Sequence, residues 1–246
     1  MSDEFDPSNL SVVIAAYKID SKQINLFAKW NHDIFVQSGV DLVVVTNKEV
    51  SPPYPWVKIV VYPTEQKRFS IPKTINYGIK SVKHNGIVIK SDIDIVFSPG
   101  IIEVIRKRVK PGFGLVCKSA RAKRGGGKFE GTKFSHKRLT PQVWEKSRIM
   151  LPAKGACFAL SVEDWYKLRG YNEELVGWGS DDSDMWNRAE VKISMCEDNR
   201  HPLLHMEHKA RTSHKKNGFF QVRSGENGII SRFSKWGETE TWGEGQ

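Results

Sequence analysis

The sequence predicts an α/β protein with a mainly parallel central sheet, flanked by helices and extended by a smaller lobe. Short apolar runs rich in β-branched residues alternate with segments of helical spacing, which is typical of such a fold. Hydrophobic residues make up 39% of the 246-residue chain, which is enough for a core in one domain. A pair of aspartates ends one of the expected strands, at the position where open α/β sheets bind ligands.

The elements follow in order along the chain. The expected strands are 11–17, 41–47, 57–62, 86–97, 113–117 and 156–160. The expected helices are 22–37, 72–84, 99–109, 162–169 and 182–190. Because strands alternate with helices, most strand pairs should be parallel. We expect a single domain made of a first half (8–117), a second half (118–217) and a polar tail (218–246).

The cysteines and the N-terminus bear on the cellular location. Cys117, Cys157 and Cys196 are far apart in sequence and odd in number, which predicts buried, reduced thiols rather than a disulfide framework. The N-terminus is acidic and polar, unlike a signal peptide, and no apolar run is long enough to cross a membrane. We therefore expect a cytoplasmic protein.

The net charge of +10 indicates either an anionic partner or a role in solubility. Nucleic acid, an anionic lipid surface, an acidic polysaccharide and a nucleotide diphosphate all fit the charge. Residues 118–138 concentrate it, with eight Lys or Arg, one acid and four Gly. We expect this segment to be a mobile loop.

Asp92 and Asp94, in KSDIDIVF, form the first candidate site. At i and i+2 they project to the same side of an extended chain. A divalent metal that bridges a diphosphate would compensate two carboxylates there. The alternative is a surface loop with two solvated acids.

Residues 177–189, GWGSDDSDMWNRA, contain the second candidate site. Asp181, Asp182 and Asp184 begin a helix for which Ser180 is a suitable N-cap, and acids there suit the helix dipole. That accounts for the acids structurally, but not for the preceding Gly-Trp-Gly, which is typical of a turn that holds a sugar face. A carboxylate beside such a turn can accept a proton from an attacking hydroxyl.

Four of the seven histidines lie in residues 201–217, HPLLHMEHKARTSHKKN. His205 and His208 are three positions apart and can complete a metal shell that Asp94 begins. A solvated basic segment is an equal alternative.

Taken in order, these motifs resemble those of the β-1,4-galactosyltransferase family and its bacterial relatives in polysaccharide synthesis. GWGSDDSDMWNRA is similar to the family's GWGGEDDDIFNR-type motif, which is the most specific of them. The other segments that resemble the family are PKTINYGIKSV, KSDIDIVF, LPAKGACFALSVEDWYKLRGYNEEL and HMEHKARTSHKKN. The likeness covers residues 10–217.

The resemblance implies a GT-A fold, with a nucleotide-sugar-binding half at 8–117 and an acceptor lobe at 118–217. It also implies a UDP-sugar donor and Mn²⁺ or Mg²⁺. The implied metal ligands are Asp94, His208 and His205. The implied catalytic residues are Asp182, as the base, and Asp181, which holds the acceptor. The implied contacts to the donor or the sugar are Asp92, Lys73, Asn76, Gly155 and Trp178.

The expected function is inverting transfer of a hexose or N-acetylhexosamine from a UDP-sugar to an acceptor glycan hydroxyl. An Asp with its ordinary pKa of about 3.9 is already ionised near neutral pH, so the base needs only position. The basic loop is expected to close over the donor. This sequence departs from the family pattern at Asp181 (Glu in the family), Ser183 (Asp) and His205 (Met), which leaves the sugar and the acceptor open.

Two alternatives are a non-catalytic sugar-binding protein and a nucleic-acid-binding protein on a similar scaffold. A nucleic-acid-binding protein would explain the charge, but the clustered acids would repel phosphates. A sugar-binding protein would keep Trp178 but has no use for Asp92, Asp94 and His208 together. The net charge further suggests a lipid-linked or acidic acceptor and peripheral membrane association, with solubility as the competing explanation.

Overall fold

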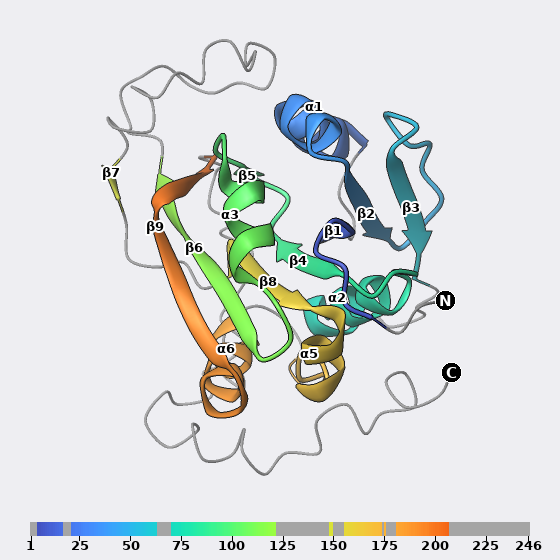
Figure 1. The fold of residues 1–246 in the computed structure, drawn as a ribbon. Coiled ribbons are helices and arrows are strands. Elements are labelled where there is room, and N and C mark those ends of the chain that lie inside the picture. Colours follow the sequence, from blue (N-terminus) through green and yellow to red (C-terminus); the bar gives the residue numbers. More distant parts are fainter. Residues whose placement is uncertain are drawn as a thin grey trace.

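A computed structural model of the chain describes residues 4–16, 21–62, 70–121, 148–149, 155–173, 175 and 181–206. These residues form one mixed sheet with helices on both faces (Figure 1). The strands are β1 (Leu10–Ala15), β2 (Val40–Thr46), β3 (Val57–Val61), β4 (Ile87–Ser91), β5 (Ile95–Val96), β6 (Phe113–Arg121), β7 (Arg148–Ile149), β8 (Cys157–Ser161) and β9 (Ser194–His205). The helices are α1 (Ser21–Gln37), α2 (Ile71–Lys80), α3 (Ile101–Arg108), α5 (Val162–Lys167) and α6 (Asp181–Lys192).

The strand order is β3-β2-β1-β4-β8-β6-β9-β5, with β7 added to β6. The strands β1, β2, β3, β4, β6 and β9 run in one direction, whereas β8 and β5 run in the opposite direction. The predicted α/β fold with a mostly parallel sheet is therefore confirmed. Because β8 is reversed, its start lies at the same sheet edge as the end of β4, where Ser91 pairs with Cys157.

Two apolar cores cover the two faces of the sheet. Helices α1 and α3 pack on one face through residues such as Phe27, Phe35 and Ile102. Helices α2, α5 and α6 pack on the other through residues such as Trp165 and Trp186. Within the described part of the chain, no helix is long and apolar enough to cross a membrane.

The expected strand 86–97 is wrong as a single strand. It breaks after Ser91, turns through Asp92–Asp94, and resumes as β5, which pairs antiparallel with β9. The two aspartates therefore do not share one side of an extended chain, because the main chain changes direction between them. The turn closes with a hydrogen bond from the amide of Ile95 to the carbonyl of Asp92.

Other boundaries also differ from the expectation. Strand β6 continues to Arg121, so the start of the predicted loop 118–138 is strand, while the rest of that loop lies outside the described residues. Strand β9 was not expected, because its residues 197–201 are charged or polar and Pro202 follows them. Helix α2 ends at Lys80 rather than at residue 84. Ser81 caps it, because its hydroxyl and its amide both donate to the carbonyl of Gly78.

The three cysteines are free thiols, as expected. Cys117 and Cys157 are buried, whereas Cys196 is only half-buried. Although far apart in sequence, they lie on the neighbouring strands β6, β8 and β9.

Candidate active site

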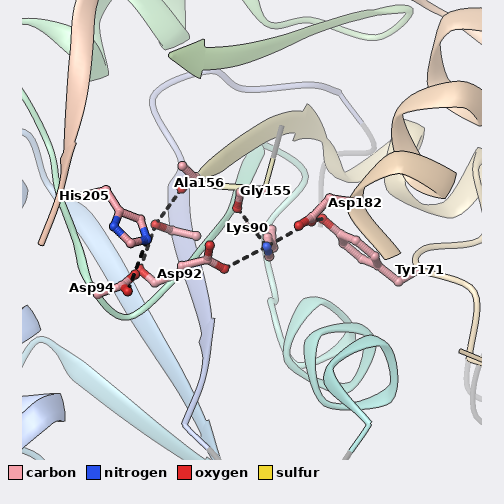
Figure 2. Close-up of polar contacts among 9 residues, drawn as sticks. Lys90, Asp92, Asp94, Gly155, Ala156, Tyr171, Asp182 and His205 are labelled. Atoms are coloured by element: carbon pink, nitrogen blue, oxygen red, sulfur yellow. Dashed lines mark hydrogen bonds and ion pairs between the residues drawn. The ribbon is translucent and has the colours of Figure 1, made fainter. Parts of the chain in front are cut away.

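The candidate site residues gather at the edge of the sheet where β4 and β9 end and β8 begins. Asp92 and Asp94 follow β4, His205 ends β9, and Gly155 precedes β8. Asp182 lies in the first turn of α6, which packs on one face of the sheet and brings this carboxylate to Lys90. Four elements distant in sequence thus bring polar residues together (Figure 2).

Lys90, the next-to-last residue of the buried β4, is the central residue of the site. Its side chain is only 2% exposed. The ammonium donates to Asp92 Oδ1 (2.9 Å), to the Gly155 carbonyl (2.8 Å) and to Asp182 Oδ1 (3.1 Å). A lysine ammonium has three donors, and these three contacts use them all (Figure 2).

Tyr171 provides a second donor to Asp182. Its hydroxyl lies 3.1 Å from Asp182 Oδ1, the same oxygen that Lys90 binds. The ring is buried and stacks on Trp165, with centroids 5.9 Å apart. The Trp165 indole in turn donates to the carbonyl of Val88 in β4 (3.0 Å). This packing fixes the tyrosine hydroxyl against the sheet.

Gly155 has no room for a side chain because the Asp182 carboxylate occupies the space. A Cβ on Gly155 would lie 2.6 Å from Asp182 Cγ, which is closer than real Cβ contacts. The glycine therefore serves two purposes: its carbonyl accepts from Lys90, and its bare Cα lets Asp182 approach β8.

Asp94 and His205 form a second polar pair. Asp94 Oδ2 lies 3.3 Å from His205 Nε2, and the side chains are 22% and 24% exposed. The pair is held by the backbone, since the amide of Met206 donates to the carbonyl of Asp94 (2.9 Å) and Ile95 pairs with His205. Asp92 lies between this pair and Lys90 (Figure 2).

A divalent metal fits this pair in part. Carboxylate oxygen suits Mn²⁺, and imidazole nitrogen is the commonest metal ligand among side chains. Neighbouring ligands of an octahedral ion at about 2.1 Å lie about 3.0 Å apart, close to the observed separation. Among the described side chains, no group of three or more His, Cys, Asp and Glu gathers in metal-binding geometry. The third predicted ligand, His208, lies outside the described residues.

The charges around Lys90 keep both Lys90 and Tyr171 protonated. Burial alone lowers the pKa of Lys90, but the carboxylates of Asp182 and Asp92 outweigh it and hold the pKa well above its ordinary value. Burial also raises the pKa of Tyr171 well above its ordinary value, and Asp182 adds to the effect although Lys90 opposes it. The ammonium therefore stays charged and the phenol keeps the proton that it donates.

Asp181 is buried near Asp182 and Lys90, with 8% of its surface exposed. Burial, followed by the negative charge of Asp182, raises its pKa to about 6, and Lys90 opposes the shift. Asp184, the third acid of the motif, has a structural contact instead. It pairs with Arg188 at 2.9 Å, and Arg188 also donates to the Leu168 carbonyl.

Lys73 and Asn76, the residues predicted near the donor, both lie on α2. Lys73 is partly exposed, whereas Asn76 is 1% exposed. The Asn76 amide donates to the Tyr171 carbonyl and to Glu173 Oε1, each at 2.9 Å, and accepts from the Tyr171 amide at 2.8 Å. Asn76 thus holds the segment that carries Tyr171, and a direct contact with the donor stays a prediction.

Sequence reasoning found the acids of the site but missed Lys90 and Tyr171. A lysine inside the apolar run GIVIKSD, next to two aspartates, was the available signal, since lysine is almost never buried without a partner. No local signal marked Tyr171, because its role depends on the fold. Trp178, predicted at the sugar site, lies outside the described residues.

Comparisons with known proteins agree with this arrangement. Residues 144–209 match a family model described as the N-terminal domain of galactosyltransferase. This span includes Gly155, Tyr171, Asp182 and His205. No curated protein matches the sequence significantly.

Solved structures of glycosyltransferases share the fold. Drosophila β1,4-galactosyltransferase 7, in complex with xylobiose, aligns with a TM-score of 0.50 and 12% identity, over 81% of this chain and 71% of that one. A mutant of that enzyme with manganese, UDP-Gal and xylobiose aligns with a TM-score of 0.51 and 10% identity, over 85% of this chain and 78% of that one. S. aureus TarS with UDP-GlcNAc aligns with a TM-score of 0.54 and 14% identity, over 82% of this chain and 59% of that one. The chain has the GT-A fold of these glycosyltransferases, and its match to the galactosyltransferase family model confirms the resemblance found in its motifs.

Proposed function

We propose that the chain is a metal-dependent glycosyltransferase that moves a sugar from a UDP-sugar to an acceptor glycan hydroxyl with inversion. The observation that carries the proposal is the meeting of two carboxylate centres at one sheet edge. The Asp94–His205 pair is suited to a metal and a diphosphate, and Asp182 is suited to a hydroxyl. Asp92 and Lys90 connect the two centres.

On the donor side, Asp94 and His205 are the described residues that would hold the metal, with His208 as the proposed third ligand. A bound divalent cation stabilises the negative charge that grows on the leaving diphosphate. Asp92, at 44% exposure, is open to contact with the ribose or the diphosphate. The neighbour complexes with manganese and UDP-Gal and with UDP-GlcNAc support a UDP-sugar as the donor.

On the acceptor side, Asp182 acts as the base. Its side chain is 30% exposed, so a hydroxyl can reach it. The acceptor O–H gives its proton to Asp182 while the acceptor oxygen forms a bond to the anomeric carbon. The bond from that carbon to the diphosphate breaks, and its electron pair leaves with the diphosphate. Attack from the side opposite the leaving group inverts the anomeric centre. Asp181 and Trp178 are proposed to hold the acceptor sugar.

The alternatives fit the site less well. A non-catalytic sugar-binding protein has no need of the Asp94–His205 pair, and a nucleic-acid-binding protein would meet four aspartates at this edge. The galactosyltransferase family match supports a transferase over both.

The test is UDP release from a panel of UDP-sugars with Mn²⁺, with and without acceptor glycans. Asp182→Asn should lower turnover by about 10²–10⁴-fold, because it removes the base and keeps the shape. Binding of the UDP-sugar, measured by calorimetry, should persist. Asp94→Ala and excess EDTA should each abolish turnover.

The control is Glu190→Gln, an exposed acid of the same helix. Asp184→Asn is unsuitable as a control because it breaks a buried ion pair with Arg188. Near-normal turnover of Asp182→Asn would reject the base, and full turnover in EDTA would reject metal dependence.

A further inference from the structure

We infer that Lys90 is a positioning residue that fixes the catalytic carboxylate of Asp182 and ties it to the donor-side Asp92. The inference rests on the proposed function of Asp182 as the base. Lys90 reaches neither the solvent nor an arriving sugar directly, since it is only 2% exposed. It acts through the residues that it holds.

The burial of the ammonium makes its three contacts obligatory. A charge removed from water is costly unless it is paired and fully hydrogen-bonded. Lys90 meets this demand with two carboxylates and one carbonyl. These acceptors come from three separate segments, namely the turn after β4, the start of β8 and the start of α6. The Lys90 side chain thus links these three segments and keeps them at a fixed separation.

The contacts also select which oxygen of Asp182 is free to react. Lys90 and Tyr171 both donate to Oδ1, at 3.1 Å each. Oδ2 is the oxygen beside Gly155. A carboxylate held by two rigid donors on one oxygen presents the other in a single orientation. We therefore assign Oδ2 as the atom that receives the proton of the acceptor hydroxyl.

Electrostatics gives the lysine a second effect. Asp182 is faced by Lys90 from β4, by Tyr171 from the segment after α5, and by Asp181 from its own helix. Lys90 is the cation among these groups, and it separates Asp182 from Asp92. Without it, three carboxylates would repel one another around the acceptor position.

The experiment is a double-mutant cycle with Lys90→Met, Asp182→Asn and the double variant, measured as kcat and as KM for the UDP-sugar. Lys90→Met keeps an unbranched, flexible side chain that is one heavy atom shorter, and it removes the charge and its three donors. It should lower kcat by about 10²-fold, the typical effect of misplacing a catalytic group. KM should change less than kcat, and Lys90→Met should add almost nothing once Asp182 is Asn.

Lys58→Met is the matched control. Lys58 also donates to a backbone carbonyl, that of Ser81 at 3.1 Å, but it is exposed and lies on β3, away from the site. Its kcat and KM should equal those of the wild type. An unchanged kcat for Lys90→Met, or a full further loss in the Asp182→Asn background, would overturn the inference while leaving the base assignment intact. A fully active Asp182→Asn would instead overturn the proposed function.

A second measurement covers the case in which Lys90→Met does not fold. The ammonium of Lys90 in the wild type should give a protected ¹H–¹⁵N NMR signal, because its three protons are hydrogen-bonded away from water. Asp182→Asn should shift that signal, since it replaces a charged acceptor with a neutral one. A rapidly exchanging signal, or one that Asp182→Asn leaves unmoved, would contradict the contact.

Discussion

At Asp181 the protein keeps a carboxylic acid in surroundings that disfavour its ionised form. Its pKa of about 6 in the folded chain exceeds the value of about 3.9 expected in the unfolded chain. The folded state therefore binds more protons than the unfolded state between about pH 4 and pH 6. The free energy of unfolding falls as the pH rises through this window, and the loss is complete above it.

Asp181→Asn should therefore stabilise the protein at pH 7.5 relative to the wild type, by an amount on the order of 1–3 kcal/mol. At pH 4 the difference should nearly vanish, because both side chains are then neutral. The measurement is the urea midpoint at both pH values, with Glu190→Gln as the control. A stability difference that is equal at both pH values would contradict the burial of this charge.

At Gly155, the absence of a side chain is itself a requirement of the site. Gly155→Ala should cost about 1–3 kcal/mol of stability through overpacking against Asp182. It should also displace the carboxylate and lower turnover. In an Asp182→Ala background the added methyl meets no carboxylate, so the loss of stability should shrink, as measured by thermal unfolding of the four proteins. An equal loss in both backgrounds would place the clash elsewhere.

How far the sequence predicts the site is clearest at single residues. Asp94, His205 and Asp182 were found because acids and histidines in short motifs carry a chemical signal of their own. Lys90 was missed because burial, which makes it unusual, depends on contacts with Gly155 and Asp182, and these are far away in sequence. Tyr171 was missed for the same reason.

At the scale of elements, helix α2 determines where the tyrosine lies. Asn76 binds both the amide and the carbonyl of Tyr171, and a Cβ on the adjacent Gly170 (φ +61°) would lie 2.9 Å from Asn76 Cγ. The segment can pass this close to the helix because Gly170 has no side chain and adopts a positive φ at little cost.

Asn76→Ala should destabilise the fold by about 2–3 kcal/mol, because it leaves buried backbone groups of Tyr171 without a partner. It should also reduce turnover, since the tyrosine hydroxyl loses its support. Thermal unfolding and kcat are the measurements. Asn9→Ala, which removes an exposed amide–carboxylate contact with Asp6, is the control and should change neither. A stable, fully active Asn76→Ala would show that the segment needs no such anchor.

Elements with a clear apolar period were predicted well, and those shaped by distant partners were not. Strands β1 and β2 and helix α1 follow their sequence patterns closely. Strand β9 could not be seen locally, because its polar first part is stabilised by pairing with β6. The break between β4 and β5 was missed because β-branched apolar residues stand on both sides of the two aspartates, and only the pairing of β5 with β9 shows where the chain turns.

At the scale of the whole molecule, the charge of +10 predicts how the protein selects its acceptor. An acceptor that carries sulfate or phosphate should react faster at low salt than an uncharged acceptor of equal length, by about tenfold in kcat/KM. The advantage should fade between about 20 and 300 mM salt as the Debye length contracts. The measurement is kcat/KM for both acceptors across this range. Equal values at every salt concentration would mean that the charge serves solubility alone.

The reversed strand β8 has a consequence for how the protein could be divided. Lys90 and Asp92 belong to the chain before β7, whereas Gly155 and Asp182 belong to the chain after it. They meet only because β4 pairs with β8 and β6 pairs with β9. Two separately encoded fragments, split between residues 121 and 148, should each lack a working site and regain one on association. Sugar-transfer activity would then measure the association of the two fragments, as in a split-enzyme sensor.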